Sequence, residues 1–215
     1  MGKQETFSVS EVKRLCAESE YLDESDIHEG DKTVSFDGNI IYYKNRKPKA
    51  TGSEVLIPVQ IKGKLYKKLP SKTIISYSVS VRDLNNYFKN GGIIYFVVAI
   101  EETSNRLKTF AKILLPIDIQ NIILGKEKQG TIVIHLRHIK DYLELERFCA
   151  LFCENKLKQS LVVLGGSKLD FSLIRQFKIS SLYSNYQDPA LILAQDKEEY
   201  FYAVQNGIDI PIPLL

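Results

Sequence analysis

The sequence predicts an α/β domain with a mixed central sheet flanked by helices, followed by a smaller β-rich segment. Over the first 160 residues, strand-like aliphatic runs alternate with helical patterns, which is typical of α/β folds. After about residue 160, short apolar runs are separated by turn residues and predict strands. We therefore expect one domain over residues 1–160 and a β-rich segment over 161–215. Because the chain stops at an apolar Pro213-Leu-Leu, we expect this segment to begin a second domain of a longer protein.

The composition excludes several classes of protein. With 215 residues, 44% hydrophobic and 26% charged, the chain resembles an ordinary soluble globular protein. No apolar run approaches 18 residues, so we expect no membrane span. The N-terminus is polar and has no signal-peptide pattern. Three cysteines are a small and odd number, which does not suit a disulfide framework and favours a reducing cytoplasm.

The first elements are a helix and two strands. A capping box, Ser8 with Glu11 three residues later, predicts a helix over residues 8–20. Residues 22–32 form an acidic connector. Strands are expected at 33–43 and 54–63, joined by a basic, turn-rich loop.

The remaining elements follow from periodicity and turn signals. Gly91 and Gly92 close a predicted helix, and the run after them is apolar enough for a central strand buried on both faces. Further strands are predicted at 73–81, 93–100, 109–115 and 131–136, and helices at 82–90, 116–124 and 139–159. In the last part, apolar pieces occupy 161–166 and 171–177, and strands are expected at 190–195, 200–204 and 208–212.

Two polar residues interrupt the otherwise apolar strand from Val55 to Gly63. Side chains alternate along a strand, so Gln60 and Lys62 point the same way. The preceding strand contains one acid, Asp37, and a hairpin would bring it beside them. An acid, a carboxamide and a lysine in this order can make a hydrolytic metal site.

These residues carry a resemblance to a known family. Asp37, followed after 22 residues by Gln60-Ile61-Lys62, resembles the D…(E/Q)xK core of the PD-(D/E)XK nuclease superfamily, whose fold is restriction-endonuclease-like. A closer likeness is to a bacterial family of unknown-function domains within it. There a VQxKG strand precedes a polar strand, a DLxxY helix and an apolar strand. Here Val59–Gly63, Asp83–Tyr87 and Ile93–Ile100 follow that order, and the likeness covers roughly residues 8–136.

The resemblance implies a Mg²⁺- or Mn²⁺-dependent nuclease that hydrolyses DNA or RNA phosphodiesters, acting as a bacterial defence effector against phage or plasmids. It implies Asp37 as the main metal ligand, joined by the side-chain oxygen of Gln60 and the carbonyl of Ile61. Lys62 would orient the attacking water and offset charge on the phosphate. Glu11 resembles the acid that many members carry on the first helix.

Each assignment has an alternative. Gln60 stands where an acid is usual, so the site should hold its metal more weakly. Asp37 precedes Gly38 and fits a turn or bulge, Gln60 and Lys62 fit a solvated hairpin edge, and Glu11 fits the capping box alone. The alternative function is a catalytically weak nucleic-acid-binding or regulatory domain of a larger defence protein.

Basic residues flank the proposed strand on both sides, which predicts a phosphate-binding surface, with a merely solvated surface as the alternative. These residues are Lys44, Arg46, Lys47, Lys49, Lys64, Lys67, Lys68 and Lys72. The expected partner is nucleic acid. A defence-system partner protein and a homo-oligomer stay open alternatives.

Overall fold

The structure, a computed structural model, describes residues 3–27, 36–46, 54–163, 169–170, 172–182 and 199–213. Its main sheet has seven strands: β1 (Leu22–Ser25), β2 (Gly38–Tyr43), β3 (Glu54–Tyr66), β4 (Ile74–Ser80), β5 (Ile93–Glu101), β6 (Leu107–Leu114) and β7 (Thr131–Ile139). Their order is β1-β2-β3-β5-β6-β7-β4, and only the β3–β5 pair is parallel. The predicted α/β class with a mixed sheet is confirmed.

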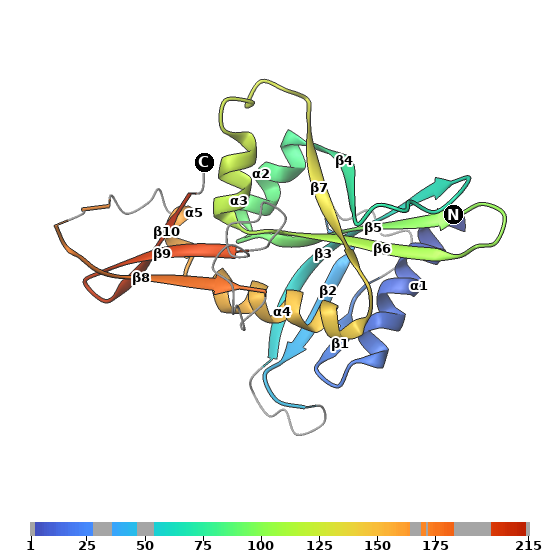
Figure 1. The fold of residues 1–215 in the computed structure, drawn as a ribbon, viewed down its shortest axis with the longest axis horizontal. Coiled ribbons are helices and arrows are strands. Elements are labelled where there is room, and N and C mark those ends of the chain that lie inside the picture. The colour runs from blue at the N-terminus through green and yellow to red at the C-terminus, as the bar shows by residue number, and fades with distance from the viewer. Residues whose placement is uncertain are drawn as a thin grey trace.

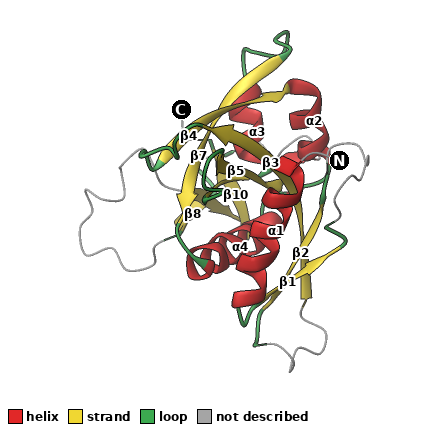
Figure 2. Ribbon diagram, turned by 90° about the vertical axis from the view of Figure 1, so that its right-hand side faces the viewer, coloured by secondary structure: helices red, strands yellow, loops and turns green. Residues whose placement is uncertain are grey.

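Helices cover both faces of this sheet, as Figure 1 shows. They are α1 (Lys3–Glu18), α2 (Val81–Lys89), α3 (Pro116–Ile123), α4 (Tyr142–Lys156) and α5 (Ser160–Val163). Helices α2 and α3 lie on one face, and α1 and α4 lie on the other (Figure 2).

Strand β5 separates the two hydrophobic cores and is buried along its whole length, as predicted. Its side chains alternate between the faces of the sheet. Phe96 and Val98 join the core under α1 and α4, whereas Tyr95 and Val97 join the core under α2 and α3.

Strand β3 changes partner part-way along its length. From Glu54 to Val59 it pairs antiparallel with β2, and from Val59 to Tyr66 it pairs parallel with β5. Strand β2 starts at Gly38, opposite Val59. Within the described residues, the edge of β3 that faces β2 therefore has no strand beside it beyond Val59, while the opposite edge is paired with β5.

The connection from β3 to β5 passes through β4 and α2. Ser80 caps α2, because its hydroxyl accepts a hydrogen bond of 3.0 Å from the Asp83 N–H. Gly91 and Gly92, with φ of +78° and +102°, end this segment in a conformation that favours glycine. The order of VQIKG strand, polar strand, DLNNY helix and apolar strand is thus present in the fold.

Helix α1 begins earlier than the predicted range of 8–20. Ser8 lies inside it, and its hydroxyl donates to the carbonyl oxygens of Gln4 and Glu5, each at 2.9 Å. The predicted capping box is therefore wrong. The apolar stripe continues upstream through the buried Val9 to Phe7, which packs against the core, and this extends the helix before residue 8.

Other boundaries also differ from the prediction, and β3 and β7 each continue three residues further, to Tyr66 and Ile139. The acidic connector contains β1, a strand too short to show a periodic pattern. The expected strand at 33–43 is β2, which starts at Gly38; residues 33–35 lie outside the described part. The helix expected at 139–159 is shorter, because Ile139 belongs to β7 and Asp141 caps α4 by accepting from the Glu144 N–H at 2.9 Å.

The C-terminal part forms a second sheet with the order β10-β9-β8. Its strands are β8 (Ile174–Ser181), β9 (Glu199–Gln205) and β10 (Ile208–Ile212). The strands predicted at 200–204 and 208–212 are confirmed. Residues 174–177 of the apolar piece at 171–177 belong to β8, and residues 161–163 of the piece at 161–166 belong to α5; residues 164–166 and 171 lie outside the described part. The strand predicted at 190–195 lies outside the described residues.

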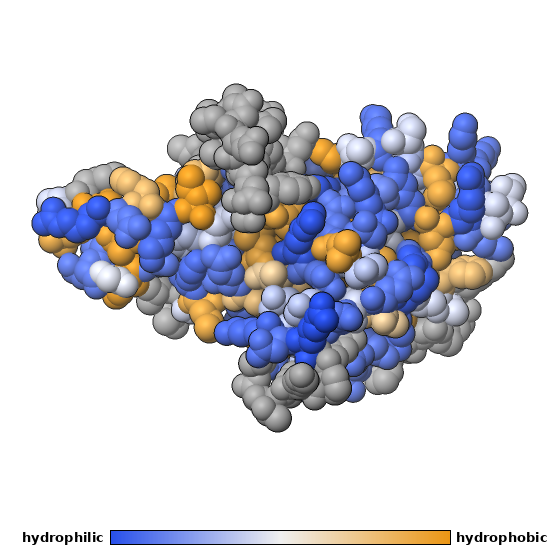
Figure 3. Space-filling view, turned by 60° about the horizontal axis from the view of Figure 1, so that its bottom comes forward, coloured by the Kyte–Doolittle hydropathy of each residue, from blue (hydrophilic) through white to orange (hydrophobic). Residues whose placement is uncertain are grey.

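This sheet shares the core of the main sheet. The hydroxyl of the buried Tyr202 donates to the Asn155 side chain at 2.7 Å and accepts from Gln159 at 3.2 Å. Phe177 and Ile179 of β8 are exposed. Figure 3 shows hydrophobic surface among hydrophilic surface at its left, where this sheet lies. The domain boundary expected near residue 160 stays a prediction.

Helices long and apolar enough to cross a membrane are absent from the described part of the chain.

Candidate functional site

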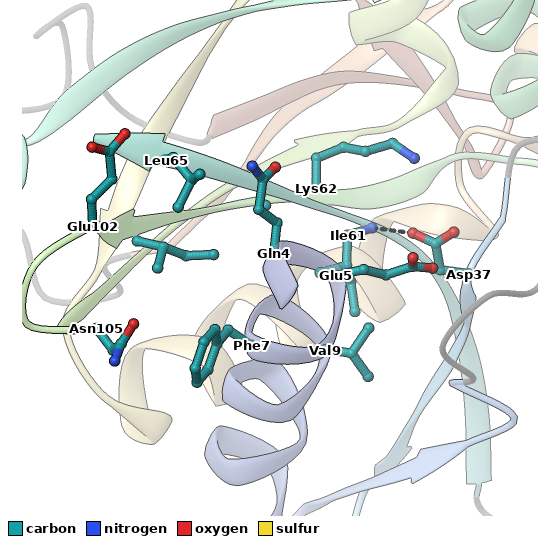
Figure 4. Close-up of a pocket in the computed structure, with 12 residues that line it drawn as sticks. Gln4, Glu5, Phe7, Val9, Asp37, Ile61, Lys62, Leu65, Glu102 and Asn105 are labelled. Carbon is teal, nitrogen blue, oxygen red and sulfur yellow. Dashed lines mark hydrogen bonds between the residues drawn. The ribbon is translucent and has the colours of Figure 1, made fainter. Parts of the chain in front are cut away.

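The candidate site lies at the start of β2, where β3 continues past β2 and is paired only with β5 among the described strands. Asp37, the residue before β2, donates its backbone N–H to the Val59 carbonyl at 2.9 Å. Its Oδ2 accepts from the Ile61 N–H at 2.7 Å (Figure 4) and from the Gln60 side-chain nitrogen. The carboxylate thus occupies the place beside β3 that a further residue of β2 would take. The predicted proximity of Asp37 to Gln60 is present.

Gly38 fixes Asp37 at this position. Its φ is +140°, and a Cβ built there would lie 2.4 Å from the Asp26 carbonyl oxygen. A larger residue would have to displace backbone, so the start of β2 requires glycine at this position. The turn or bulge considered as the alternative for Asp37 stays a prediction.

Gln60 is buried, with 4% of its surface exposed, and its amide has a partner at each end. The nitrogen donates to Asp37, and the oxygen accepts from the Tyr87 hydroxyl of α2 at 3.5 Å. A phenol can donate or accept. A half-turn of the amide would therefore point its oxygen toward Asp37 while Tyr87 accepted from the nitrogen.

The pKa of Asp37 is raised above its ordinary value of 3.8, chiefly because burial disfavours the charged carboxylate. The Ile61 N–H and the positive charge of Lys62 act in the opposite direction, and the negative charge of Glu5 adds to the rise. Lys62 is exposed on the same face of β3 as Gln60. The site therefore contains an acid that its protein neighbours stabilise incompletely.

Glu5 was not predicted as a site residue, yet the structure brings it to Asp37. In Figure 4 its carboxylate extends from α1 toward Asp37, and both residues line one cavity. Glu11 lies elsewhere: it accepts from Arg14 at 2.8 and 2.9 Å and does not line this cavity. Glu5 lies four residues before the buried Val9, so extending the helix upstream would have placed an acid on its apolar face.

Gly63 allows α1 to approach β3 this closely. A Cβ at Gly63 would lie 2.6 Å from the Gln4 carbonyl oxygen. The glycine that ends the VQIKG motif thus positions the first turn of α1, and Glu5 with it, beside the open edge of β3.

The predicted basic surface is divided into two parts. One part continues the row of lysines that begins at Lys62. It consists of the exposed residues Lys64, Lys67, Lys68 and Lys72. In contrast, Lys44 and Arg46 follow β2 at its far end, about 20 Å away for six strand residues. Arg46 also pairs with Glu20 at 2.9 Å. Lys47 and Lys49 lie outside the described residues.

The site offers oxygen ligands rather than the ligands of a zinc site. Groups of three or more His, Cys, Asp and Glu suited to a metal do not occur in the described part of the chain. Asp37 and Glu5 contribute two carboxylates, and Gln60 contributes an amide. Ile61 directs its N–H to Asp37; because the N–H and C=O of a strand residue point to the same edge, its carbonyl faces this edge too.

Comparisons with family models, curated proteins and solved structures give no match to this chain. The function is therefore argued from the site itself.

Proposed function

We propose that this protein is a divalent-metal-dependent nuclease with a restriction-endonuclease-like fold. The observation that supports it is the convergence of Asp37, Gln60, Lys62 and Glu5 at one open strand edge. An acid with a raised pKa beside a lysine in a cavity is characteristic of functional sites.

The residues present fit Mg²⁺ or Mn²⁺. Such ions prefer oxygen ligands and bind through one or two carboxylates together with water and phosphate oxygens. The two hydrogen bonds to the Asp37 carboxylate described above both end on Oδ2. Asp37 and Glu5 would hold the ion with the Ile61 carbonyl, and Gln60 would add its oxygen after the half-turn that Tyr87 permits. When bound, the ion would polarise the phosphate and lower the pKa of a water.

Lys62 has a separate role in this proposal. Its ammonium group lies close enough to Asp37 to lower the pKa of that carboxyl, so it also faces the position of the metal. A fixed positive charge there stabilises the negative charge that develops on the phosphate, and its N–H groups orient the attacking water.

Nucleic acid is the proposed substrate because exposed lysines continue from Lys62 along β3 and beyond it. Phosphate contacts of this kind release counterions, so binding should weaken steeply with salt. DNA and RNA both fit this chemistry. A role as a bacterial defence effector in the cytoplasm is proposed from the resemblance of the motifs alone.

The order of elements supports the same proposal. The polar strand β4, the helix α2 with Asp83 and Tyr87, and the apolar strand β5 follow the VQIKG strand as they do in the family that it resembles. Tyr87 of this motif contacts Gln60, which gives the DLxxY pattern a physical link to the site.

A second candidate function is a catalytically weak nucleic-acid-binding or regulatory module. The observation that favours it is the orientation of the Gln60 amide, whose N–H group donates a hydrogen bond to Asp37. An acid at this position would instead offer a further oxygen ligand for a metal. Such a module would keep the lysines along β3 but need no metal.

A cleavage assay decides between the two. Plasmid DNA, single-stranded DNA and RNA are incubated with Mg²⁺, Mn²⁺ or EDTA and with the wild type, Asp37→Ala or Lys62→Ala, after circular dichroism has established that each variant is folded. Metal-dependent cleavage that both substitutions abolish supports the nuclease. Cleavage that survives both overturns the assignment, and salt-sensitive binding without cleavage favours the module.

A further inference from the structure

A cavity of about 680 Å³ extends from Asp37 along the face of β3 and β5 that is turned toward α1. Its walls are apolar: Phe7 and Val9 come from α1, Ile61 and Leu65 from β3, and Ile100 from β5. Polar groups lie at its two ends. Asp37, Glu5 and Lys62 are at one end, Glu102 and Asn105 are at the other, and Gln4 lies between them, as Figure 4 shows.

The sequence keeps this cavity open. Gly63 contributes no side chain to it, and β2 begins opposite Val59, so it does not cover the part of β3 beyond that residue. Leu65 is left 42% exposed, although it is a large hydrophobic residue. The volume lies within the range of about 300–1,000 Å³ that is typical of small-molecule sites.

The end of the cavity with Glu102 and Asn105 is fixed by the backbone between β5 and β6. The Glu102 N–H donates to the Tyr66 carbonyl at 3.0 Å, and the Asn105 N–H donates to the Glu101 carbonyl at 2.9 Å. Asn105 has a φ of +54°, the left-handed conformation that Asn tolerates. The side chains of Glu102 and Asn105 are thus presented by an ordered turn.

The charges of the cavity select among the parts of a nucleic acid. Glu5, Asp37 and Glu102 supply three carboxylates against the one lysine, Lys62, so a phosphate would be repelled from its interior. A nucleobase is neutral, with apolar faces and a polar edge. Aromatic and aliphatic side chains such as Phe7 and Leu65 suit its faces, and carboxylate and amide groups suit its edge.

We propose that this cavity binds the base of a nucleotide adjacent to the phosphate at Asp37, an inference that rests on the proposed nuclease function. The carboxylate of Glu102 accepts hydrogen bonds, so it favours bases with an exocyclic amino group, such as cytosine or adenine, over thymine or uracil. Entry of a base requires that it be unpaired, so single strands or unpaired positions are the preferred substrates.

The test uses single-stranded oligonucleotides of thymidines that contain one cytosine at a known position. Cleavage sites and rates are mapped for the wild type, Phe7→Leu, Glu102→Gln and a control, Glu54→Gln. Glu54 is exposed at the opposite end of β3 and does not line the cavity. We expect the wild type and the control to cut beside the cytosine about tenfold faster than between thymidines. Glu102→Gln should reduce this preference to about twofold, and Phe7→Leu should raise KM about tenfold by removing the stacking surface.

The outcomes separate this inference from the proposed function. If all four proteins cut with the same site preference and KM, the cavity does not bind a base, although the nuclease assignment stands. If none cuts, the nuclease assignment fails, and fluorescence anisotropy with the same oligonucleotides decides the inference. Tighter binding of the cytosine oligonucleotide, lost in Glu102→Gln alone, would support a base site. Equal binding of both sequences would overturn it.

Discussion

Two acids of the main sheet, Glu101 at the end of β5 and Asp37 beside the middle of β3, show how differently one fold can treat a carboxylate. Glu101 is 5% exposed and is surrounded by donors. It accepts from the Ser104 hydroxyl, from Arg106 at 2.9 and 3.1 Å, and from the Leu69 N–H at 3.3 Å. These bonds, that of Ser104 first, lower the pKa of Glu101.

Asp37 has fewer partners and the opposite shift. Two N–H groups donate to it, both on Oδ2, and burial raises its pKa despite them. Glu5 adds negative charge instead of compensating it. The comparison teaches that Glu101 is a structural acid whose charge is balanced within the protein. Under the proposed function, a bound metal ion would balance the charge of Asp37.

The largest expected difference between the two acids is in catalysis. Asp37→Asn should lower the rate of cleavage on the order of 1000-fold or more, because it removes the main metal ligand. Glu101→Gln should leave the rate within about threefold but lower the melting temperature, because Arg106 loses its charged partner. Cleavage rates and thermal melts of the two variants measure both effects. Equal losses of activity would remove the distinction between the acids.

Lys62 sharpens the comparison, because it is the cation beside Asp37 as Arg106 is the cation beside Glu101. Lys62→Met should reduce kcat about 100-fold while the protein stays folded. Lys64 follows on the same face of β3 and provides the control. Lys64→Met should chiefly raise KM and reduce the slope of log binding constant against log salt by about one. The proposed role of Lys62 would be wrong if its variant behaved like that of Lys64.

Gln60→Glu should bring a second charge to Asp37. We expect Mg²⁺ to bind about tenfold more tightly, because the charge of the ligands tunes affinity. Without metal, two carboxylates sharing a buried site destabilise the fold, so the melting temperature in EDTA should fall. Melts with EDTA and with Mg²⁺ test this. If Mg²⁺ raised the melting temperature of Gln60→Glu less than that of the wild type, this would argue against Gln60 as a ligand.

The pH dependence of stability should also distinguish the two acids. The pKa of Asp37 is raised above 3.8 in the folded state. At pH values between the pKa of the unfolded state and that of the folded state, the folded state therefore binds more protons. The contribution of Asp37 to the free energy of unfolding therefore decreases as pH rises through this window. For Glu101, whose pKa is lowered, the contribution is present above its unfolded pKa and is lost as pH falls. Urea unfolding of each Asn or Gln variant relative to the wild type, from pH 3 to 7 in EDTA, should give slopes of opposite sign.

Much of the site could be predicted because its signals are local. The strand with Gln60 and Lys62 and the helix with Asp83 and Tyr87 lie in strongly patterned segments, and the structure has both. Glu5 was missed because the polar start of the chain and the Ser8–Glu11 pair suggested a later helix start. The contact between Tyr87 and Gln60 joins residues 27 positions apart and depends on how α2 packs on the sheet. Such tertiary contacts leave no periodic signal.

The most direct test of the difference between Asp37 and Glu101 is calorimetric titration of the folded protein with Mn²⁺. We predict that the wild type and Glu101→Gln bind the ion at one site with similar affinity, and that Asp37→Asn does not bind it there. A site of this kind also stabilises the fold by about 2.7 kcal/mol when the metal is at 100 times its Kd. Unchanged binding by Asp37→Asn, or loss of binding in Glu101→Gln with Asp37 intact, would contradict the account.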